Sequence, residues 1–291
     1  MKKNQAIHQP AKRIGLALGG GGAKGLAHIG VIKALEEEGL IIDFVAGTSM
    51  GALVGGWYAA NRNIKFLENI FLKIEKENIF SEEEAKQQGG NLFRGKNFGE
   101  MLEKILDGKT FSQCELPFSA VATNMENGHE LDINEGELAE AIKASIALPI
   151  VFQPVKRDGQ LLVDGAFTNP VPADVVREMG AEFVIAVDVS SRWVNIPNDM
   201  LNPKGTDALI RDAFTAIEYQ LARKTLKQAD VVIRPAVLTY DWLDFSRAKE
   251  IIKAGYRETK KQLDEIREKA GYPKKDPETL VDKIADLLEG N

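Results

Sequence analysis

The chain has 291 residues, 44% of them hydrophobic and 27% charged, which excludes a disordered chain, a collagen-like chain and a disulfide scaffold. The formal net charge is −6, with 37 Lys and Arg against 43 Asp and Glu, and this argues against nucleic acid as the main partner. Cys114 is the only cysteine, so no internal disulfide can form and we expect a cytoplasmic protein.

The N-terminal tail, residues 1–12, is basic, and we expect it to be flexible. No apolar segment of signal-peptide length follows it, and no run in the chain approaches the roughly 18 apolar residues of a membrane-spanning helix. Lys2, Lys3, Lys12 and Arg13 are compatible with peripheral contact at the inner membrane surface, although four charges on a short tail are more often a solvated terminus.

Two strand–turn–helix units follow the tail. Each begins with a short apolar run, stops at glycines and continues with helical periodicity. This repetition is typical of an α/β protein with a mostly parallel sheet. The expected strands are residues 14–18 and 41–46, and the expected helices are residues 23–38 and 52–60.

Residues 61–115 have a different character. Apolar residues recur at helical spacing up to Ile74, then a charged stretch and a polar loop precede another short amphipathic helix over residues 98–106. We interpret residues 61–115 as a cap or lid inserted over the sheet, although ordinary core packing explains any one of its apolar residues as well.

The remainder of the chain continues the α/β pattern. No linker separates two regions of different composition, so we expect a single domain over residues 13–275 and a C-terminal amphipathic helix over residues 276–291. The expected strands are residues 117–123, 161–164, 183–189 and 231–233, and the expected helices are residues 137–146, 207–228 and 246–269.

The segment from Gly47 to Gly51 reads G-T-S-M-G and matches the G-x-S-x-G pattern of serine hydrolases. It follows an expected strand and precedes an expected helix, which is the context in which a sharp turn presents a serine hydroxyl. The helix start also places N–H groups and a positive dipole end near a developing oxyanion. Ser49 is therefore a candidate nucleophile, and the alternative is a serine that only caps the helix.

A glycine-rich loop, G-G-G-G-A-K-G over residues 19–25, lies between the first strand and helix. Gly20, Gly22 and Gly25 fit G-x-G-x-x-G, but the dinucleotide interpretation needs an acidic residue at the end of the second strand, and Asp43 opens that strand instead. The loop also lacks the Lys-Ser/Thr ending of a phosphate loop. A third interpretation is an oxyanion hole, with Lys24 adding positive potential.

The sequence has no histidine in the usual position for a base that would activate Ser49. An α/β-hydrolase triad ends in histidine, but no histidine follows His129. Asp164 at the end of a strand is the best base, and Asp188 is its rival. We interpret His28 as a packed residue of the first helix and His129 as a polar residue of a turn, so neither is favoured as the base. No Cys and His cluster has the spacing of metal ligands.

Taken together, these segments resemble the patatin-like phospholipase family, most closely its bacterial branch related to the catalytic domain of neuropathy target esterase. The resemblance covers about residues 13–260. It depends on several motifs that occur in the same order as in the family, because together they are more specific than any single motif. The matching segments are residues 19–25, His28 to Val31, residues 47–51, Ala144 to Pro149 with Phe152 and Pro154, Asp164-Gly165-Ala166, and Asn169-Pro170.

The resemblance implies a three-layer α/β/α fold with a mostly parallel sheet and a Ser–Asp dyad that corresponds to Ser49 and Asp164. It also implies an oxyanion hole at Gly20, Gly21 and Gly22, to which we add the N–H of Met50. The resemblance implies a reaction without metal, and we expect no cofactor. Many members have Arg where this chain has Lys24, a cationic replacement that leaves the prediction unchanged.

The function that we predict is acyl-ester hydrolysis of a phospholipid, a lysophospholipid or a related ester. Two other classes stay open: a protein of the same fold that acts as a non-enzymatic regulator, and a Rossmann-type dinucleotide-binding protein. The sequence leaves the head group, the acyl length and the oligomeric state open.

Overall fold

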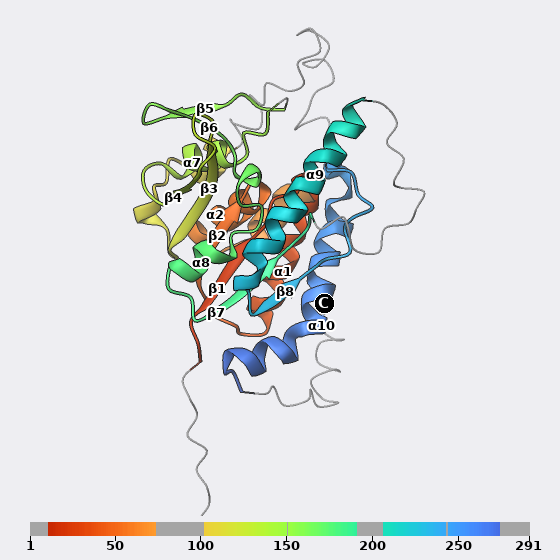
Figure 1. Cartoon of the computed structure of the whole chain (residues 1–291). Coiled ribbons are helices and arrows are strands. Elements are labelled where there is room, and N and C mark those ends of the chain that lie inside the picture. Colours follow the sequence, from red (N-terminus) through yellow and green to blue (C-terminus); the bar gives the residue numbers. More distant parts are fainter. Residues whose placement is uncertain (1–10, 74–101, 150, 191–205, 243, 274–291) are drawn as a thin grey trace, which may run out of the picture.

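The structure, a computed structural model, describes residues 11–73, 102–149, 151–190, 206–242 and 244–273 (Figure 1). Their strands form one eight-stranded sheet in the order β5-β6-β3-β2-β1-β7-β8, with β4 also paired to β3. The strands are β1 Ile14–Leu18, β2 Ile42–Thr48, β3 Phe118–Asn124, β4 Glu130–Ile133, β5 Val155–Arg157, β6 Gln160–Asp164, β7 Phe183–Val187 and β8 Val231–Ile233.

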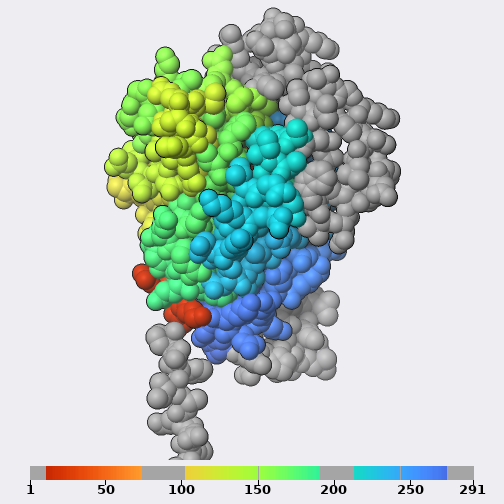
Figure 2. All heavy atoms as spheres, viewed as in Figure 1, coloured from red at the N-terminus to blue at the C-terminus, as the bar shows by residue number. Residues whose placement is uncertain are grey.

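Helices cover both faces of this sheet. The α-helices are α1 Ala27–Glu37, α2 Met50–Asn61, α3 Ile64–Lys73, α7 Leu138–Ser145, α8 Ala173–Glu178, α9 Thr206–Thr225 and α10 Ala248–Ala270. Short 3-10 helices include η1 Gly22–Leu26, η2 Phe111–Gln113, η3 Gly165–Phe167, η5 Leu226–Gln228 and η6 Phe245–Arg247. Helix α9 crosses in front of the strands in Figure 1, and the space-filling view of the same side in Figure 2 shows its residues at the surface.

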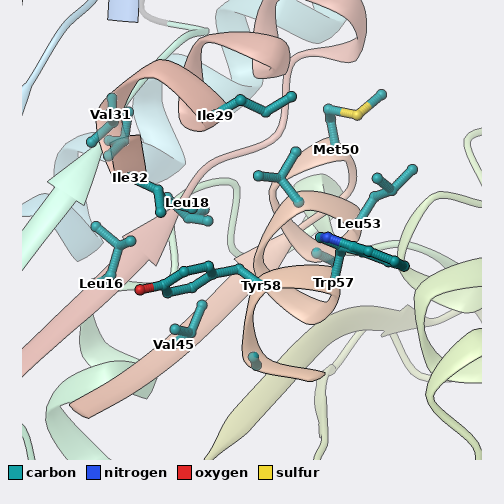
Figure 3. Close-up of a cluster of buried hydrophobic side chains, with 14 of the residues drawn as sticks. Leu16, Leu18, Ile29, Val31, Ile32, Val45, Met50, Leu53, Trp57 and Tyr58 are labelled. Carbon is teal, nitrogen blue, oxygen red and sulfur yellow. The ribbon is translucent and has the colours of Figure 1, made fainter. Parts of the chain in front are cut away.

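The alternation of side chains along the central strand explains the layers. Leu16 and Leu18 of β1 point to one side, where they join a large apolar cluster with α1 and α2, whereas Ala17 joins a second cluster with α8 on the other side. Figure 3 shows the first cluster, in which Leu16, Leu18 and Val45 of the strands meet Ile29, Val31 and Ile32 of α1 and Met50, Leu53, Trp57 and Tyr58 of α2. The three-layer α/β/α architecture with a mostly parallel sheet is confirmed.

The pairing around β3 positions the site. Strand β2 runs parallel to β3 and its last residue, Thr48, pairs with Val121. Strand β4 pairs with residues of β3 that overlap both the β2 and the β6 pairings, so β4 occupies one edge of β3, and β2 and β6 share the other. Strand β6 is antiparallel, and its last residue, Asp164, pairs with Ala122, next to Val121. The carboxyl ends of β2 and β6 therefore meet on one edge of β3.

Most of the predicted elements occur close to their expected bounds. Short elements that the sequence did not reveal are β4, β5 and α8. Within the predicted cap, α3 buries Ile64, Leu67 and Phe71 in the apolar core. Leu102 and Leu106, later in the same predicted region, are also buried in the core. Residues 74–101 of that prediction lie outside the described residues, as do the predicted tail up to residue 10 and the predicted helix over residues 276–291. Among the helices that are described, none has the length and apolarity needed to cross a membrane.

Candidate active site

Ser49 occupies the turn between β2 and α2 with φ 55° and ψ −121°, a backbone conformation that non-glycine residues seldom adopt. Such a turn is the arrangement that exposes a nucleophilic serine hydroxyl. Its flanking glycines are needed because the chain passes very close to itself. A Cβ at Gly47 would lie 2.3 Å from the Gly51 oxygen, and one at Gly51 would lie 2.0 Å from the Leu18 oxygen.

The structure brings Ser49 and Asp164 together. Ser49 Oγ donates a hydrogen bond of 2.7 Å to Asp164 Oδ2. The Asp164 side chain is buried, and its other oxygen accepts from the Ala166 N–H at 2.9 Å. Burial raises the pKa of Asp164 to about 6, although the hydrogen bonds from Ala166 and Ser49 act in the opposite direction. A carboxylate with that pKa is ionised at neutral pH and can still accept a proton.

Gly165, directly after Asp164, permits the strand to end where it does. A Cβ at this position would lie 2.2 Å from the Val121 oxygen, so a larger residue would push β6 away from β3. Asp164 is also fixed through its backbone, because its carbonyl oxygen accepts from Thr123 Oγ1 at 2.9 Å and its N–H donates to Ala147. The carboxylate is thus held against Ser49 by contacts on several sides.

Ser145, at the end of α7, is a site residue for which sequence reasoning assigned no role. Its hydroxyl accepts a 2.9 Å hydrogen bond from the Ser49 N–H and donates one of 2.6 Å to the Val121 oxygen. Ser145 is completely buried, and its hydroxyl links the strained Ser49 backbone to β3 in addition to the β2–β3 pairing. The sequence signal was available, since Ser145 lies in the Ala144 to Pro149 segment that resembles the family.

The glycine-rich loop lies next to Ser49. Gly19 and Gly20 direct their N–H groups to the carbonyl oxygens of Val187 and Pro170, at 3.0 and 2.9 Å. This corrects the prediction for Gly20, whose N–H is occupied within the protein and is not offered to a ligand. Gly21 and Gly22 have φ 152° and 57°, values that favour glycine, and no partner for their N–H groups is found among the described residues.

Met50 begins helix α2, so its N–H is one of the groups that a helix leaves without an internal partner. Its side chain packs on the glycine loop, since a Cβ at Gly25 would lie 2.4 Å from Met50 Cγ. Lys24 lies beside Gly25 in η1. The N–H groups of Gly21, Gly22 and Met50 are thus the candidate donors for an oxyanion.

The His28 ring contacts the backbone of the glycine-rich loop and is not placed to act as a base. Its ring is fully buried in α1, and Nε2 lies 2.7 Å from the Gly19 oxygen. Burial lowers the pKa of His28 to about 4, so the ring is neutral at physiological pH and Nε2–H donates to Gly19. His129 is an exposed turn residue whose carbonyl oxygen accepts from Asn124.

Asp188 and Asp43, the aspartates of the two alternative interpretations, form hydrogen bonds or ion pairs with other groups. Asp188, the rival base, is buried, accepts from the Ser190 N–H and lies 3.5 Å from Arg234 Nε. Asp43, the acidic residue considered for a dinucleotide, accepts from the Ile14 N–H at 2.7 Å. That contact lies at the start of β1, the end of the strand opposite the glycine loop, so Asp43 cannot reach a ligand bound there.

Glu218 is a second residue that the sequence did not single out. It lies on α9, between Phe214, whose ring centroid is 4.7 Å from that of Phe167, and the buried Ala222. Glu218 is 7% exposed, and burial raises its pKa to about 8, with the nearby charge of Asp164 adding to the effect and that of Lys24 opposing it. Helix α9 thus brings a second carboxyl group close to Asp164, on a face of the helix that is otherwise packed against the protein.

Among the described residues, no group of three or more His, Cys, Asp or Glu side chains is arranged to hold a metal ion. The groups that the structure brings together at the candidate site are a serine, a carboxylate and backbone N–H groups. This combination is sufficient for acyl transfer, because the serine can attack, the carboxylate can take its proton and the N–H groups can bind the resulting oxyanion.

The chain belongs to the patatin-like phospholipase family. The model of that family, described as "Patatin-like phospholipase", matches residues 16–177, a range that includes the glycine loop, Ser49 and Asp164. This confirms the resemblance noted from the motifs.

Relatives in two groups of organisms support the same assignment. The chain is 30% identical over 273 residues to "Patatin-like phospholipase domain-containing protein 6" of Homo sapiens, a match that covers 84% of this chain and 20% of the human protein. It is 33% identical over 217 residues to an uncharacterized NTE family protein of Mycobacterium tuberculosis, covering 74% of this chain and 60% of the relative. The chain thus spans only part of the length of these relatives.

Among solved structures, the fold is similar to VipD from Legionella pneumophila. The TM-score is 0.52 at 16% sequence identity, and the match covers 89% of this chain and 68% of VipD. This likeness supports the fold alone.

Proposed function

We propose that this protein is a serine acyl hydrolase that releases a fatty acid from a phospholipid, a lysophospholipid or a related ester. The observation that carries the proposal is the 2.7 Å hydrogen bond from Ser49 Oγ to the buried carboxylate of Asp164. Membership of the patatin-like phospholipase family supports a lipid ester as the substrate.

In the acylation step, Ser49 Oγ attacks the ester carbonyl carbon while its proton passes to Asp164 Oδ2. The negative charge that develops on the carbonyl oxygen is stabilised by the N–H groups of Gly21, Gly22 and Met50. Collapse of the tetrahedral intermediate breaks the bond to the alcohol, which leaves with the proton from Asp164. The product of this step is an acyl ester on Ser49.

In the deacylation step, Asp164 accepts a proton from a water molecule that attacks the acyl carbon. The same N–H groups stabilise the second oxyanion, and its collapse returns the proton to Ser49 Oγ and releases the fatty acid. Removal of one oxyanion donor costs about 3 kcal/mol of transition-state stabilisation in comparable enzymes. Backbone donors are fixed by the fold, so they need no reorganisation during the reaction.

A fluorophosphonate probe tests this proposal directly, because it forms a covalent adduct with an activated serine whatever the natural substrate. We expect intact-mass spectrometry to show one adduct per chain, and peptide mapping to place it on Ser49. The adduct should be absent in Ser49→Ala and strongly reduced in Asp164→Asn. Ser112→Ala, which removes an exposed hydroxyl in η2, is the matched control and should label normally.

Absence of labelling in well-folded protein, with and without detergent, would contradict the enzymatic proposal and favour the non-enzymatic regulator. A rise in melting temperature with a dinucleotide would instead favour the binding protein. If Ser49 is labelled, release of fatty acid from a panel of phospholipids and lysophospholipids identifies the head group and the acyl length.

We also propose a cytoplasmic location for the protein and a lid function for the predicted cap. A single cysteine is compatible with the reducing cytoplasm, and peripheral contact with the inner membrane surface would bring the site to its lipid. We propose that residues 61–115 form a mobile lid over the site. Limited proteolysis tests this, because cleavage within the lid should change when lipid micelles are added. Unchanged cleavage would contradict the proposed lid.

A further inference from the structure

Asn169 is a fully buried polar residue in the turn that follows η3. Its backbone oxygen accepts a 2.7 Å hydrogen bond from Thr48 Oγ1, and its backbone N–H donates one of 2.8 Å to the Gly165 oxygen. Thr48 precedes Ser49, and Gly165 follows Asp164. The backbone of this one residue therefore contacts both chain segments that supply the proposed dyad.

Pro170 adds the third segment. Its carbonyl oxygen accepts the Gly20 N–H at 2.9 Å, which ties the beginning of the glycine-rich loop to the same turn. Gly20 in turn lies beside Ser49, because a Cβ at Gly20 would be 3.4 Å from the Ser49 Cβ. The dipeptide 169–170 thus joins the segments of the nucleophile, the base and the oxyanion donors, which are far apart in the sequence.

The Asn169 side chain determines how this dipeptide is oriented. Its Nδ2 donates hydrogen bonds of 2.9 Å to Glu130 Oε1 on β4 and of 2.7 Å to Asp174 Oδ1 at the beginning of α8. Its Oδ1 is buried and has no partner among the described residues, so the two N–H bonds set the orientation of the amide. The two N–H donors of the amide nitrogen satisfy both carboxyl groups, whereas an ionised aspartate would offer no donor and would add negative charge beside them.

We propose that Asn169 is a positioning residue that holds the Ser49 turn, the Asp164 turn and the glycine-rich loop in register through its backbone and that of Pro170. The inference rests on the proposed hydrolase function. It adds a residue that does not react itself but keeps the reacting groups at the distance that the reaction needs. An error of about 1 Å between reacting groups can cost about 100-fold in rate, so the effect should be large.

Asn169→Asp is the variant that tests this proposal, because it keeps the shape of the side chain and removes both donors. We expect the rate constant for fluorophosphonate labelling of Ser49 and kcat to fall about 100-fold, with KM changed much less, since alignment is lost and binding is kept. Asn63→Asp is the matched control. Asn63 is exposed and its side-chain oxygen accepts from the Phe66 N–H, a role that aspartate can also fill.

Thr48 supplies a milder pair of variants for the case in which Asn169→Asp does not fold. Thr48→Ser keeps the hydroxyl that donates to the Asn169 oxygen and should retain labelling, whereas Thr48→Val has nearly the same shape without the donor and should lose about tenfold. Equal labelling rates for the folded Asn169→Asp variant and the unaltered protein would overturn the proposal, and so would equal rates for Thr48→Val and Thr48→Ser.

Hydrogen exchange separates a failure of this proposal from a failure of the proposed function. The Gly20 N–H is protected by the Pro170 oxygen, and we expect faster exchange in the peptide that contains it in Asn169→Asp but not in Asn63→Asp. If the unaltered protein does not label but this difference is seen, the hydrolase function is wrong and the positioning role stands. If the protein labels and the difference is missing, the positioning role is wrong.

Discussion

The pH dependence of Ser49 reactivity follows from the burial of Asp164. The carboxylate must be ionised to accept the serine proton, and burial raises its pKa from 3.8 to about 6. The ionised fraction therefore falls from about 0.9 at pH 7 to about 0.1 at pH 5, which predicts an approximately tenfold loss of rate. With an unshifted pKa of 3.8, the loss over the same interval would be only about a twentieth of the rate.

The assay is the second-order rate constant for fluorophosphonate labelling, measured by mass spectrometry between pH 5 and 7.5. It reports the attack by Ser49 without a contribution from product release or lipid aggregation. Circular dichroism at each pH checks that the protein stays folded. A rate that stays constant within twofold from pH 5 to 7 would refute the reasoning, because it would mean that Asp164 either is not the base or is not desolvated.

The same pKa shift has a consequence for stability. The folded protein holds the Asp164 proton more tightly than the unfolded chain does, so the contribution to stability is complete below about pH 4 and is lost as the pH rises through 6. Asp164→Asn carries no charge and escapes this loss. At pH 7 we expect it to be more stable than the unaltered protein by about 1–3 kcal/mol in urea unfolding, with a gap that narrows toward pH 4.

Three further predictions concern groups around the dyad. Ser145→Ala should lower the free energy of unfolding by about 2 kcal/mol in urea titrations, because buried backbone groups lose their partner, whereas Ser112→Ala at an exposed position should not. Gly22→Ala places a Cβ 2.2 Å from a backbone oxygen and should slow labelling about 100-fold, whereas Gly39→Ala, with a similar φ and nothing within 4 Å, should leave labelling unchanged. Glu218→Gln should be more stable than the unaltered protein by an amount that grows from pH 5 to 8 in urea titrations, since the pKa of Glu218 is raised and its ionisation in the folded protein is costly.

The local parts of the site could be predicted from the sequence. A strand, a G-x-S-x-G turn and a helix lie within about 20 residues, so Ser49 and its backbone geometry follow from short-range rules. The sequence favours Asp164 over Asp188 because it ends a strand and is followed by Gly165, which lets the chain turn away. Its contact with Ser49, however, depends on β2 and β6 sharing an edge of β3. That arrangement involves residues more than 100 positions apart, and their roles as nucleophile and base stay predictions.

The supporting residues could not be predicted for the same reason. Ser145 and Asn169 act through hydrogen bonds to distant backbone groups, and a lone serine or asparagine has no periodic signal. The occupied N–H of Gly20 depends on where Pro170 lies, which no local pattern specifies. The elements that were missed, β4, β5 and α8, have 4, 3 and 6 residues, too short for a clear alternation or helical period.

The position of β1 inside the sheet sets a limit on how this protein can be divided. Strand β1 pairs with β2 on one side and with β7 on the other, but the region that matches the family ends at residue 177, before β7. A fragment cut at that boundary would leave the edge of an apolar, fully buried strand open along its whole length. Open edges of this kind pair with other chains, so the fragment should aggregate even though it keeps every residue of the proposed dyad and glycine loop. Soluble expression would need the chain to continue at least through β7 and β8.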